Sequence, residues 1–113
     1  MEPQPSVLAK LMATIEDRKV NPPPRSYTSL LFEGGVEKIG AKITEEAAEV
    51  VDAARHAQDD AGRDHLTHEV ADLIYHVLVV LAHRDVTLQA VEQKLASRFG
   101  VSGIDEKELR NKS

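Results

Sequence analysis

Apolar residues recur every three or four positions through most of the chain, the spacing at which they line one side of a helix. These stripes predict helices over residues 7–19, 28–33, 36–57, 65–84 and 88–98. No stretch of the sequence alternates apolar and polar residues in the way a half-buried strand does. The pattern therefore predicts an all-α fold, a helical bundle of four to five helices.

Capping residues mark where these helices begin and end. Ser6, Ser26 and Thr87 are expected N-caps, because a side-chain hydroxyl can accept a hydrogen bond from a free N–H group of the first turn. Gly100 is expected to stop the last helix.

Three short segments interrupt the helices. Val20–Arg25 (VNPPPR) contains three consecutive prolines, which cannot continue a helix and favour an extended chain. Gly34 and Gly35 are expected to break or bend the chain between two helical segments. Gln58–Asp64 (QDDAGRD) is polar and contains a glycine, so we expect a turn before the helix over 65–84.

The long helix over residues 36–57 is expected to have one apolar and one charged side. At about 100° per residue, its expected core-facing residues are Val36, Ile39, Ile43, Ala47, Val50 and Ala54. The opposite side then carries Lys38, Lys42, Glu45 and Glu49, with Glu46 at the boundary. The last helix has a stripe that is expected to be buried, formed by Leu88, Val91, Leu95 and Phe99.

The helix over residues 65–84 is apolar around most of its circumference, and such a helix is normally buried. One polar stripe nevertheless runs along it, formed by His65, Glu69, Asp72 and His76. Buried acids are rare unless they are paired or bind a metal. Glu69 and Asp72 therefore need partners, and the charged side of the preceding helix is the candidate across a helical hairpin.

Five acids in two short motifs can meet across that hairpin, Glu45, Glu46 and Glu49 in EExxE and Glu69 and Asp72 in ExxD. By itself, the first motif fits a solvated helix face on which Lys and Glu side chains form ion pairs one turn apart. Like charges at this spacing repel each other, and the repulsion grows near a buried core. With both motifs together, we interpret the five acids as one site for a hard divalent metal, Mg2+.

Such a site suits hydrolysis of a phosphoanhydride, because Mg2+ binds substrate phosphates and polarises phosphoryl oxygens. Lys38 and Lys42 precede the acids by one or two turns and could reach phosphate oxygens. Ser26, Tyr27 and Thr28, at the start of a short helix, offer hydroxyls and free N–H groups that also suit a phosphate. Plain helix capping explains these three residues equally well.

The histidines raise the possibility of a different metal. Di-iron bundles use Glu-x-x-His on paired helices, whereas the acids here read Glu-x-x-Glu and Glu-x-x-Asp, which favours a metal with oxygen ligands. His76, four residues after Asp72, can hold a ligating carboxylate, contact a phosphate, or be an ordinary core histidine.

Composition narrows the function classes further. The 113 residues suggest one domain over residues 1–100, followed by a charged tail over 101–113 that is expected to be weakly ordered. The net charge of −5 argues against non-specific nucleic-acid binding, which needs a basic face. The longest apolar run, Val77–Ala82, is too short to span a bilayer, so no membrane partner is expected. The absence of cysteine and of a secretory signal fits a cytoplasmic protein.

These motifs, in this order, resemble those of the all-α nucleoside triphosphate pyrophosphohydrolases, the MazG-like superfamily. Within it, several features are similar to the phosphoribosyl-ATP pyrophosphohydrolase family. They are SYT at Ser26–Thr28, Gly35 ahead of Lys38–Ile39, KITEE at Lys42–Glu46, DLIYHVLVVL at Asp72–Leu81 and Leu-x-x-Arg at Leu95–Arg98. The similarity covers roughly Leu8 to Arg98, most of the chain.

The resemblance implies Mg2+-dependent hydrolysis of phosphoribosyl-ATP to phosphoribosyl-AMP and pyrophosphate, the second step of histidine biosynthesis, by a homodimer. The metal ligands it implies are Glu46, Glu49, Glu69 and Asp72. The catalytic candidates are Glu45 and Glu46, and whether Glu45 is a further ligand or the base that activates water stays open. The substrate-binding candidates are Ser26, Tyr27, Lys38, Lys42 and His76. Two alternatives are a house-cleaning nucleoside triphosphate pyrophosphohydrolase with the same acids, and a non-catalytic helical dimer stabilised by metal.

Overall fold

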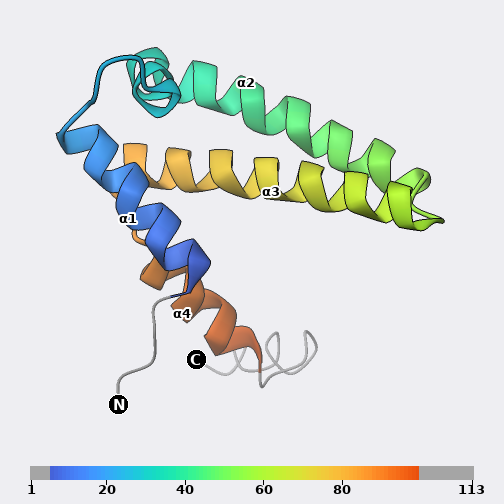
Figure 1. The fold of residues 1–113 in the computed structure, drawn as a ribbon. Coiled ribbons are helices and arrows are strands. Elements are labelled where there is room, and N and C mark those ends of the chain that lie inside the picture. Colours follow the sequence, from blue (N-terminus) through green and yellow to red (C-terminus); the bar gives the residue numbers. More distant parts are fainter. Residues whose placement is uncertain (1–5, 100–113) are drawn as a thin grey trace.

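The computed structural model describes residues 6–99, and this part of the chain is all-α, as predicted. Its four helices are α1 (Val7–Val20), α2 (Tyr27–Arg55), α3 (Asp60–His83) and α4 (Leu88–Phe99). Helices α2 and α3 lie side by side as a long antiparallel hairpin, and α1 packs across one end of it (Figure 1). The predicted stop at Gly100 and the predicted tail lie outside the described residues.

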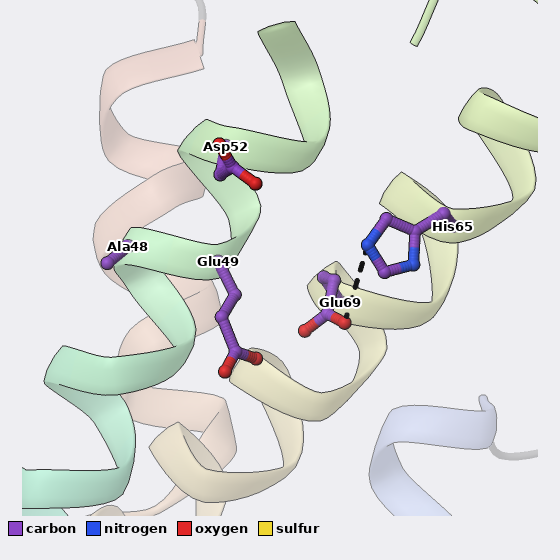
Figure 2. Close-up of a pocket in the computed structure, with 5 residues that line it drawn as sticks. All are labelled: Ala48, Glu49, Asp52, His65 and Glu69. Atoms are coloured by element: carbon purple, nitrogen blue, oxygen red, sulfur yellow. Dashed lines mark ion pairs between the residues drawn. The ribbon is translucent and has the colours of Figure 1, made fainter. Parts of the chain in front are cut away.

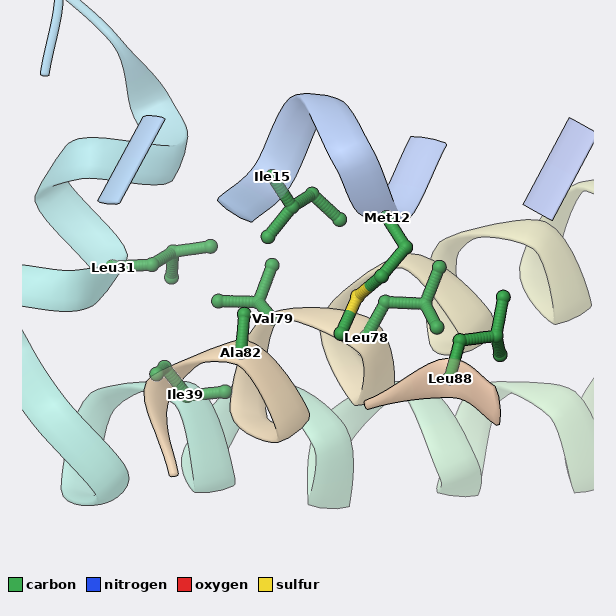
Figure 3. Packing of buried hydrophobic residues seen from close by; sticks show 8 residues of the cluster. All are labelled: Met12, Ile15, Leu31, Ile39, Leu78, Val79, Ala82 and Leu88. Carbon is green, nitrogen blue, oxygen red and sulfur yellow. The ribbon is translucent and has the colours of Figure 1, made fainter. Parts of the chain in front are cut away.

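The hydrophobic core lies where α1, α2, α3 and the start of α4 meet (Figure 3). Its fully buried centre is formed by Ile15, Leu31, Ile39 and Val79. Around them lie Met12, Leu78, Ala82 and Leu88. Burying one such side chain contributes about 1.5–3 kcal/mol, so this end of the hairpin is the rigid support for everything beyond it.

The predicted bend at the glycine pair is present within α2. Gly35 has φ 66° and ψ −162°, a backbone conformation that breaks the helix into two segments with different directions. A residue with a Cβ is strained in this region, whereas glycine adopts it freely. The predicted cap is also confirmed, because Ser26 Oγ accepts a hydrogen bond from the Ser29 N–H group at 3.2 Å. The bend sets how the segment that starts at Tyr27 approaches α3.

The start of α3 differs from the prediction, which placed a turn over Gln58–Asp64. The helix begins at Asp60, and Asp59 is its N-cap, since Asp59 Oδ1 accepts a hydrogen bond from Gly62 N–H at 2.7 Å. Gly62 therefore lies in the first helical turn. A Cβ on Gly62 would come within 2.3 Å of the His56 carbonyl oxygen, so the glycine allows this turn to pack tightly against the end of α2.

The predicted core face of α2 is partly wrong. Ala47 and Ala54 are exposed, and the buried line runs instead through Ile39, Glu46 and Ala53, at intervals of seven residues. The helical-wheel argument assigned apolar residues to the core and placed the acid at the boundary. Glu46 turns inward because α3 supplies a hydrogen-bond partner for its carboxylate.

Burial is also less complete on α4 and α3 than predicted. Leu88 is buried, but Leu95 and Phe99 are 57% and 89% exposed, so most of the α4 stripe faces outward. Ile74 and Val77 of α3 are exposed as well. The four helices of one chain leave these faces uncovered. Among residues 6–99, no helix is both long enough and apolar enough to cross a bilayer.

Candidate active site

A pocket of about 430 Å³ opens between the distal halves of α2 and α3. Its walls are formed by Ala48, Glu49, Asp52, His65 and Glu69. Glu49 points from α2 toward Glu69 on α3, with Asp52 one turn further along α2 (Figure 2). The antiparallel hairpin therefore brings an acid from each of the two predicted motifs to one opening.

Glu69 is a buried acid with an unsatisfied carboxylate oxygen. The residue is only 9% exposed, and its Oε2 atom is buried without a hydrogen-bond partner within the described structure. Its Oε1 atom lies 3.9 Å from Nε2 of His65, one turn earlier on α3. A buried oxygen without a partner costs about 1–3 kcal/mol. A cation placed between the helices would satisfy this atom, so the donor set fits a metal with oxygen ligands.

Glu49 lies on the open side of the same pocket and is exposed. The neighbouring Glu69 side chain is the main cause of a raised pKa of the Glu49 carboxyl group. Partial loss of hydration and repulsion from Glu69, Glu45 and Glu46 raise this pKa further. The acids around Glu49 therefore carry more negative charge than the protein compensates, and a divalent cation would relieve this repulsion.

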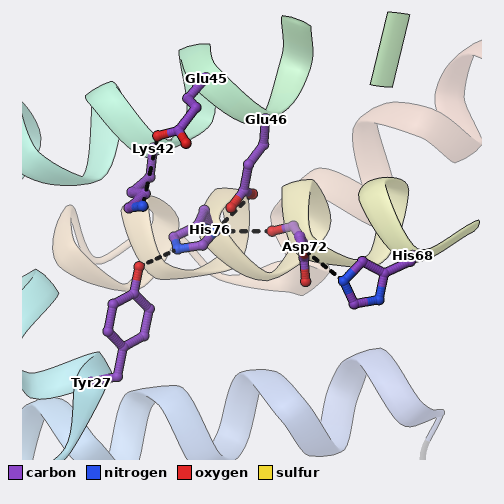
Figure 4. A network of polar contacts seen from close by, with 7 residues as sticks. All are labelled: Tyr27, Lys42, Glu45, Glu46, His68, Asp72 and His76. Carbon is purple, nitrogen blue, oxygen red and sulfur yellow. Dashed lines mark hydrogen bonds and ion pairs between the residues drawn. The ribbon is translucent and has the colours of Figure 1, made fainter. Parts of the chain in front are cut away.

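Glu46 is held in a different way, inside a hydrogen-bond chain (Figure 4). Its Oε2 atom lies 2.8 Å from Nδ1 of His76, and both residues are buried, at 8% and 5% exposure. The other ring nitrogen, Nε2, lies 3.0 Å from the hydroxyl of Tyr27. The chain thus connects the first turn of α2, the middle of α3 and the EExxE motif.

Asp72 lies on the side of His76 that faces the distal end of the hairpin. Its backbone carbonyl oxygen is 3.0 Å from His76 Nδ1. Its carboxylate lies 3.3 Å from Nε2 of His68, an exposed histidine one turn earlier. Asp72 is half-buried, and its carboxylate already has a histidine neighbour.

The predicted phosphate-binding residues differ from one another in their contacts. Lys42 forms an ion pair of 3.6 Å with Glu45, and both side chains are about half exposed. Lys38 is exposed on the same helix. Of the SYT segment, Ser26 caps α2, Tyr27 contacts His76, and the Thr28 hydroxyl is hydrogen-bonded to the Tyr75 hydroxyl. The capping explanation of Ser26 is thus present, and the phosphate-binding role of this segment stays a prediction.

The structure divides the predicted metal ligands into two groups. Glu49 and Glu69 share the pocket, while Glu46 and Asp72 surround His76. Within residues 6–99, no three acidic or histidine side chains already converge in an arrangement that would hold a metal ion. Magnesium commonly keeps several waters and binds through one or two carboxylates plus substrate phosphates. An incomplete protein ligand set is compatible with that mode of binding.

Sequence reasoning missed two residues of this region. Asp52 lines the pocket, and it lies three residues after Glu49, so extending the acidic stripe by one turn would have found it. Tyr75 packs edge-on against His76 with ring centroids 5.0 Å apart. An aromatic residue next to a histidine in the sequence carries no signal of this packing, because the contact depends on the rotamers of the two neighbouring side chains on α3.

The chain is similar to known proteins over most of its length. A family model described as phosphoribosyl-ATP pyrophosphohydrolase matches residues 8–99. A phosphoribosyl-ATP pyrophosphatase from Rhodopirellula baltica is 47% identical over 103 residues, which cover 91% of this chain and 85% of the relative. One from Hydrogenovibrio crunogenus is 39% identical over 107 residues, covering 95% of each protein.

This chain matches only part of one longer relative. A histidine biosynthesis bifunctional protein from Caldanaerobacter subterraneus is 42% identical over 93 residues, which cover 82% of this chain and 43% of that protein. The family model spans all four helices and both acidic motifs. The chain therefore belongs to the phosphoribosyl-ATP pyrophosphohydrolase family.

Proposed function

We propose that this protein hydrolyses phosphoribosyl-ATP to phosphoribosyl-AMP and pyrophosphate in histidine biosynthesis, in the cytoplasm. The substrate is inferred from the family match over residues 8–99, together with relatives that are named phosphoribosyl-ATP pyrophosphatase. The two acidic motifs face each other across the α2–α3 hairpin, which supports a hydrolase site at that place.

The reaction uses Mg2+ held by Glu46, Glu49, Glu69 and Asp72. The unpartnered Oε2 atom of Glu69 and the raised pKa of Glu49 support this assignment, because both indicate negative charge that the described residues leave uncompensated. When bound, the ion supplies charge neutralisation for the phosphates and polarises the phosphoryl oxygen under attack.

The remaining residues orient the substrate and take the proton. Lys42 lies beside the acids and, with Lys38 one turn earlier, contacts phosphate oxygens that the metal does not hold. Ser26 and Tyr27 border the same region from the start of α2. Glu45 is half exposed, so its carboxylate can reach solvent and accept the proton that the attacking water loses. Breaking the bond between the α and β phosphates then releases pyrophosphate.

The active protein is a homodimer. Leu95 and Phe99 on α4 and Ile74 and Val77 on α3 are exposed in one chain. Burying apolar surface stabilises association by roughly 25 cal/mol per Å² before the costs of association are counted. A second copy that covers these faces would complete the bundle and enclose the open side of the pocket.

The test is pyrophosphate release with Mg2+ from phosphoribosyl-ATP, compared with ATP, dCTP and dUTP. We expect strong preference for phosphoribosyl-ATP, and loss of turnover in Glu69→Gln with the fold intact by circular dichroism. Glu37→Gln is the matched control, because Glu37 is an exposed acid on α2 outside the two motifs. Preference for a simple triphosphate would assign the protein to house-cleaning hydrolysis. Thermal stabilisation by Mg2+ without any turnover would indicate a non-catalytic metal-stabilised dimer.

A further inference from the structure

We infer that His76 is a positioning residue that holds the Glu46 carboxylate for metal binding, and that the Tyr27 hydroxyl holds His76 in turn. This inference rests on the proposed function, because it takes Glu46 to be a ligand of the proposed Mg2+ site. It goes beyond that function by assigning His76 to a carboxylate of the protein instead of to the substrate.

The contacts of His76 determine which of its nitrogens carries hydrogen. Nδ1 lies 2.8 Å from Glu46 Oε2 and 3.0 Å from the Asp72 carbonyl oxygen. A carboxylate and a carbonyl oxygen only accept hydrogen bonds, so Nδ1 must carry the hydrogen and donate it. In the neutral ring, Nε2 then accepts, and its neighbour at 3.0 Å, the hydroxyl of Tyr27, is the donor.

The hydrogen bond from His76 orients the Glu46 carboxylate. A hydrogen bond from a ring N–H group to Oε2 fixes the plane of the carboxylate and leaves the lone pairs of Oε1 for a cation. Carboxylates that bind metals are commonly oriented by such hydrogen bonds from a second layer of residues. Because the same N–H group also contacts the Asp72 carbonyl, His76 links one residue from each acidic motif.

The surroundings of His76 do not favour direct phosphate binding. The residue is 5% exposed, and both ring nitrogens already form hydrogen bonds with other side chains. The nearest charged group is the carboxylate of Glu46, which repels a phosphate. A phosphate contact would require the ring to leave partners on both sides.

Two aromatic residues keep the imidazole ring in this orientation. Tyr75 packs edge-on against it, with ring centroids 5.0 Å apart and an interplanar angle of 81°. Tyr27 and Tyr75 in turn stack at 6.4 Å. Burial raises the pKa of the Tyr27 hydroxyl, so Tyr27 keeps the hydrogen that it donates. The ring is thus held by edge-on contacts with aromatic rings and by hydrogen bonds at both nitrogens.

Two amide substitutions test the contacts of the two ring nitrogens of His76 one at a time. Asparagine places its amide near the position of Nδ1, so H76N keeps a donor for Glu46 and loses the contact with Tyr27. Glutamine reaches the position of Nε2, so H76Q keeps the contact with Tyr27 and loses the donor for Glu46. Removing a supporting residue of a metal ligand typically weakens metal affinity about 10–100-fold. We expect H76Q to raise the Mg2+ concentration for half-maximal pyrophosphate release by about tenfold or more, and H76N to restore most of that loss.

A second measurement needs neither metal nor substrate. Nitrogen-15 NMR of the metal-free protein should show the His76 ring with hydrogen on Nδ1, and Tyr27→Phe should shift the Nε2 resonance. Tyr27 is about half exposed, so this variant is expected to fold even if both amide variants do not. Hydrogen on Nε2 in the wild-type protein would overturn the inference.

The outcomes separate this inference from the proposed function. Wild-type activity with equal Mg2+ requirements for H76N and H76Q would overturn the positioning role and leave the function standing. A wild-type protein that releases no pyrophosphate would overturn the function. His76 could then still be assessed from the Mg2+-induced rise in melting temperature. A rise in wild type and H76N but not in H76Q would support the positioning role, and equal rises in all three would refute it.

Discussion

Replacing Gly35 with alanine tests whether the bend in α2 is required by the backbone and whether it places Tyr27 at the site. Gly35 has φ 66° and ψ −162°, a conformation that costs other residues about 1–3 kcal/mol. The nearest atom to a Cβ at this position would be His83 Nε2, at 3.8 Å. Space is therefore sufficient, and the expected loss of stability comes from backbone strain alone.

Gly40, five residues later, is the matched control. It lies in the straight part of α2, and nothing lies within 4 Å of the position that a Cβ would take. Alanine in a helix interior is favoured over glycine by about 0.5–1 kcal/mol. At about 4 °C per kcal/mol, Gly35→Ala should lower the melting temperature by about 4–12 °C, whereas Gly40→Ala should raise it by about 2–4 °C.

Thermal unfolding followed by circular dichroism, at one fixed protein concentration, measures both shifts. The reasoning is refuted if Gly35→Ala melts at or above the wild-type temperature, or if both alanines shift it equally. The same geometry also predicts a change that NMR can detect. Where α2 straightens to relieve this strain, Tyr27 moves away from His76, and the His76 Nε2 resonance of Gly35→Ala then shifts in the direction that Tyr27→Phe does.

Three further perturbations have defined expectations. Leu31→Ala should cost about 2–5 kcal/mol in denaturant unfolding because Leu31 is fully buried, while Leu30→Ala, half exposed, should cost far less; similar costs would contradict the core assignment. The folded-state pKa of Glu49 is raised, so its proton stabilises the fold below its ordinary pKa of 4.5 and this contribution is lost as pH rises through the raised pKa. Metal-free Glu49→Gln should therefore melt above wild type at pH 7, with a gap that closes toward pH 4.5; a lower melting point at pH 7 would refute this. Leu95→Ser should shift a dimer toward monomer in light scattering, whereas exposed Lys94→Ser should not, and a strict wild-type monomer would count against the proposed dimer.

The sequence predicted the helices well because their signals are local. The caps at Ser6, Ser26 and Thr87 are present, each accepting an N–H group of the following first turn. The bend at Gly35 is also where the glycine pair predicted it. The start of α3 was missed because the Gln58–Asp64 segment reads as a turn by composition. Its glycine packs closely against the His56 carbonyl at the end of α2, a contact across the turn that composition alone does not show.

Burial was harder to predict because it depends on how much surface one chain can cover. The apolar stripe of α4 is regular, yet Leu95 and Phe99 remain exposed since no helix within residues 6–99 lies over them. Glu46 shows the opposite error. A helical wheel places it at a boundary, and it is buried because His76 is positioned to hydrogen-bond its carboxylate. The two acidic motifs could therefore be located in the sequence, but the sequence does not show which of their carboxylates has a hydrogen-bond donor within the protein.

That difference in compensation indicates how the acidic site tolerates its own charge. Glu46 has a buried hydrogen-bond donor, so its carboxylate is stable without metal. Glu69 has a buried oxygen without a partner among residues 6–99, and its neighbour Glu49 holds its proton more tightly than usual. The free energy released by a cation should consequently be concentrated at the Glu49–Glu69 pair. In the proposed site, His76 would hold the Glu46 carboxylate in place, while Glu49 and Glu69 would adjust to the ion and to the substrate phosphates.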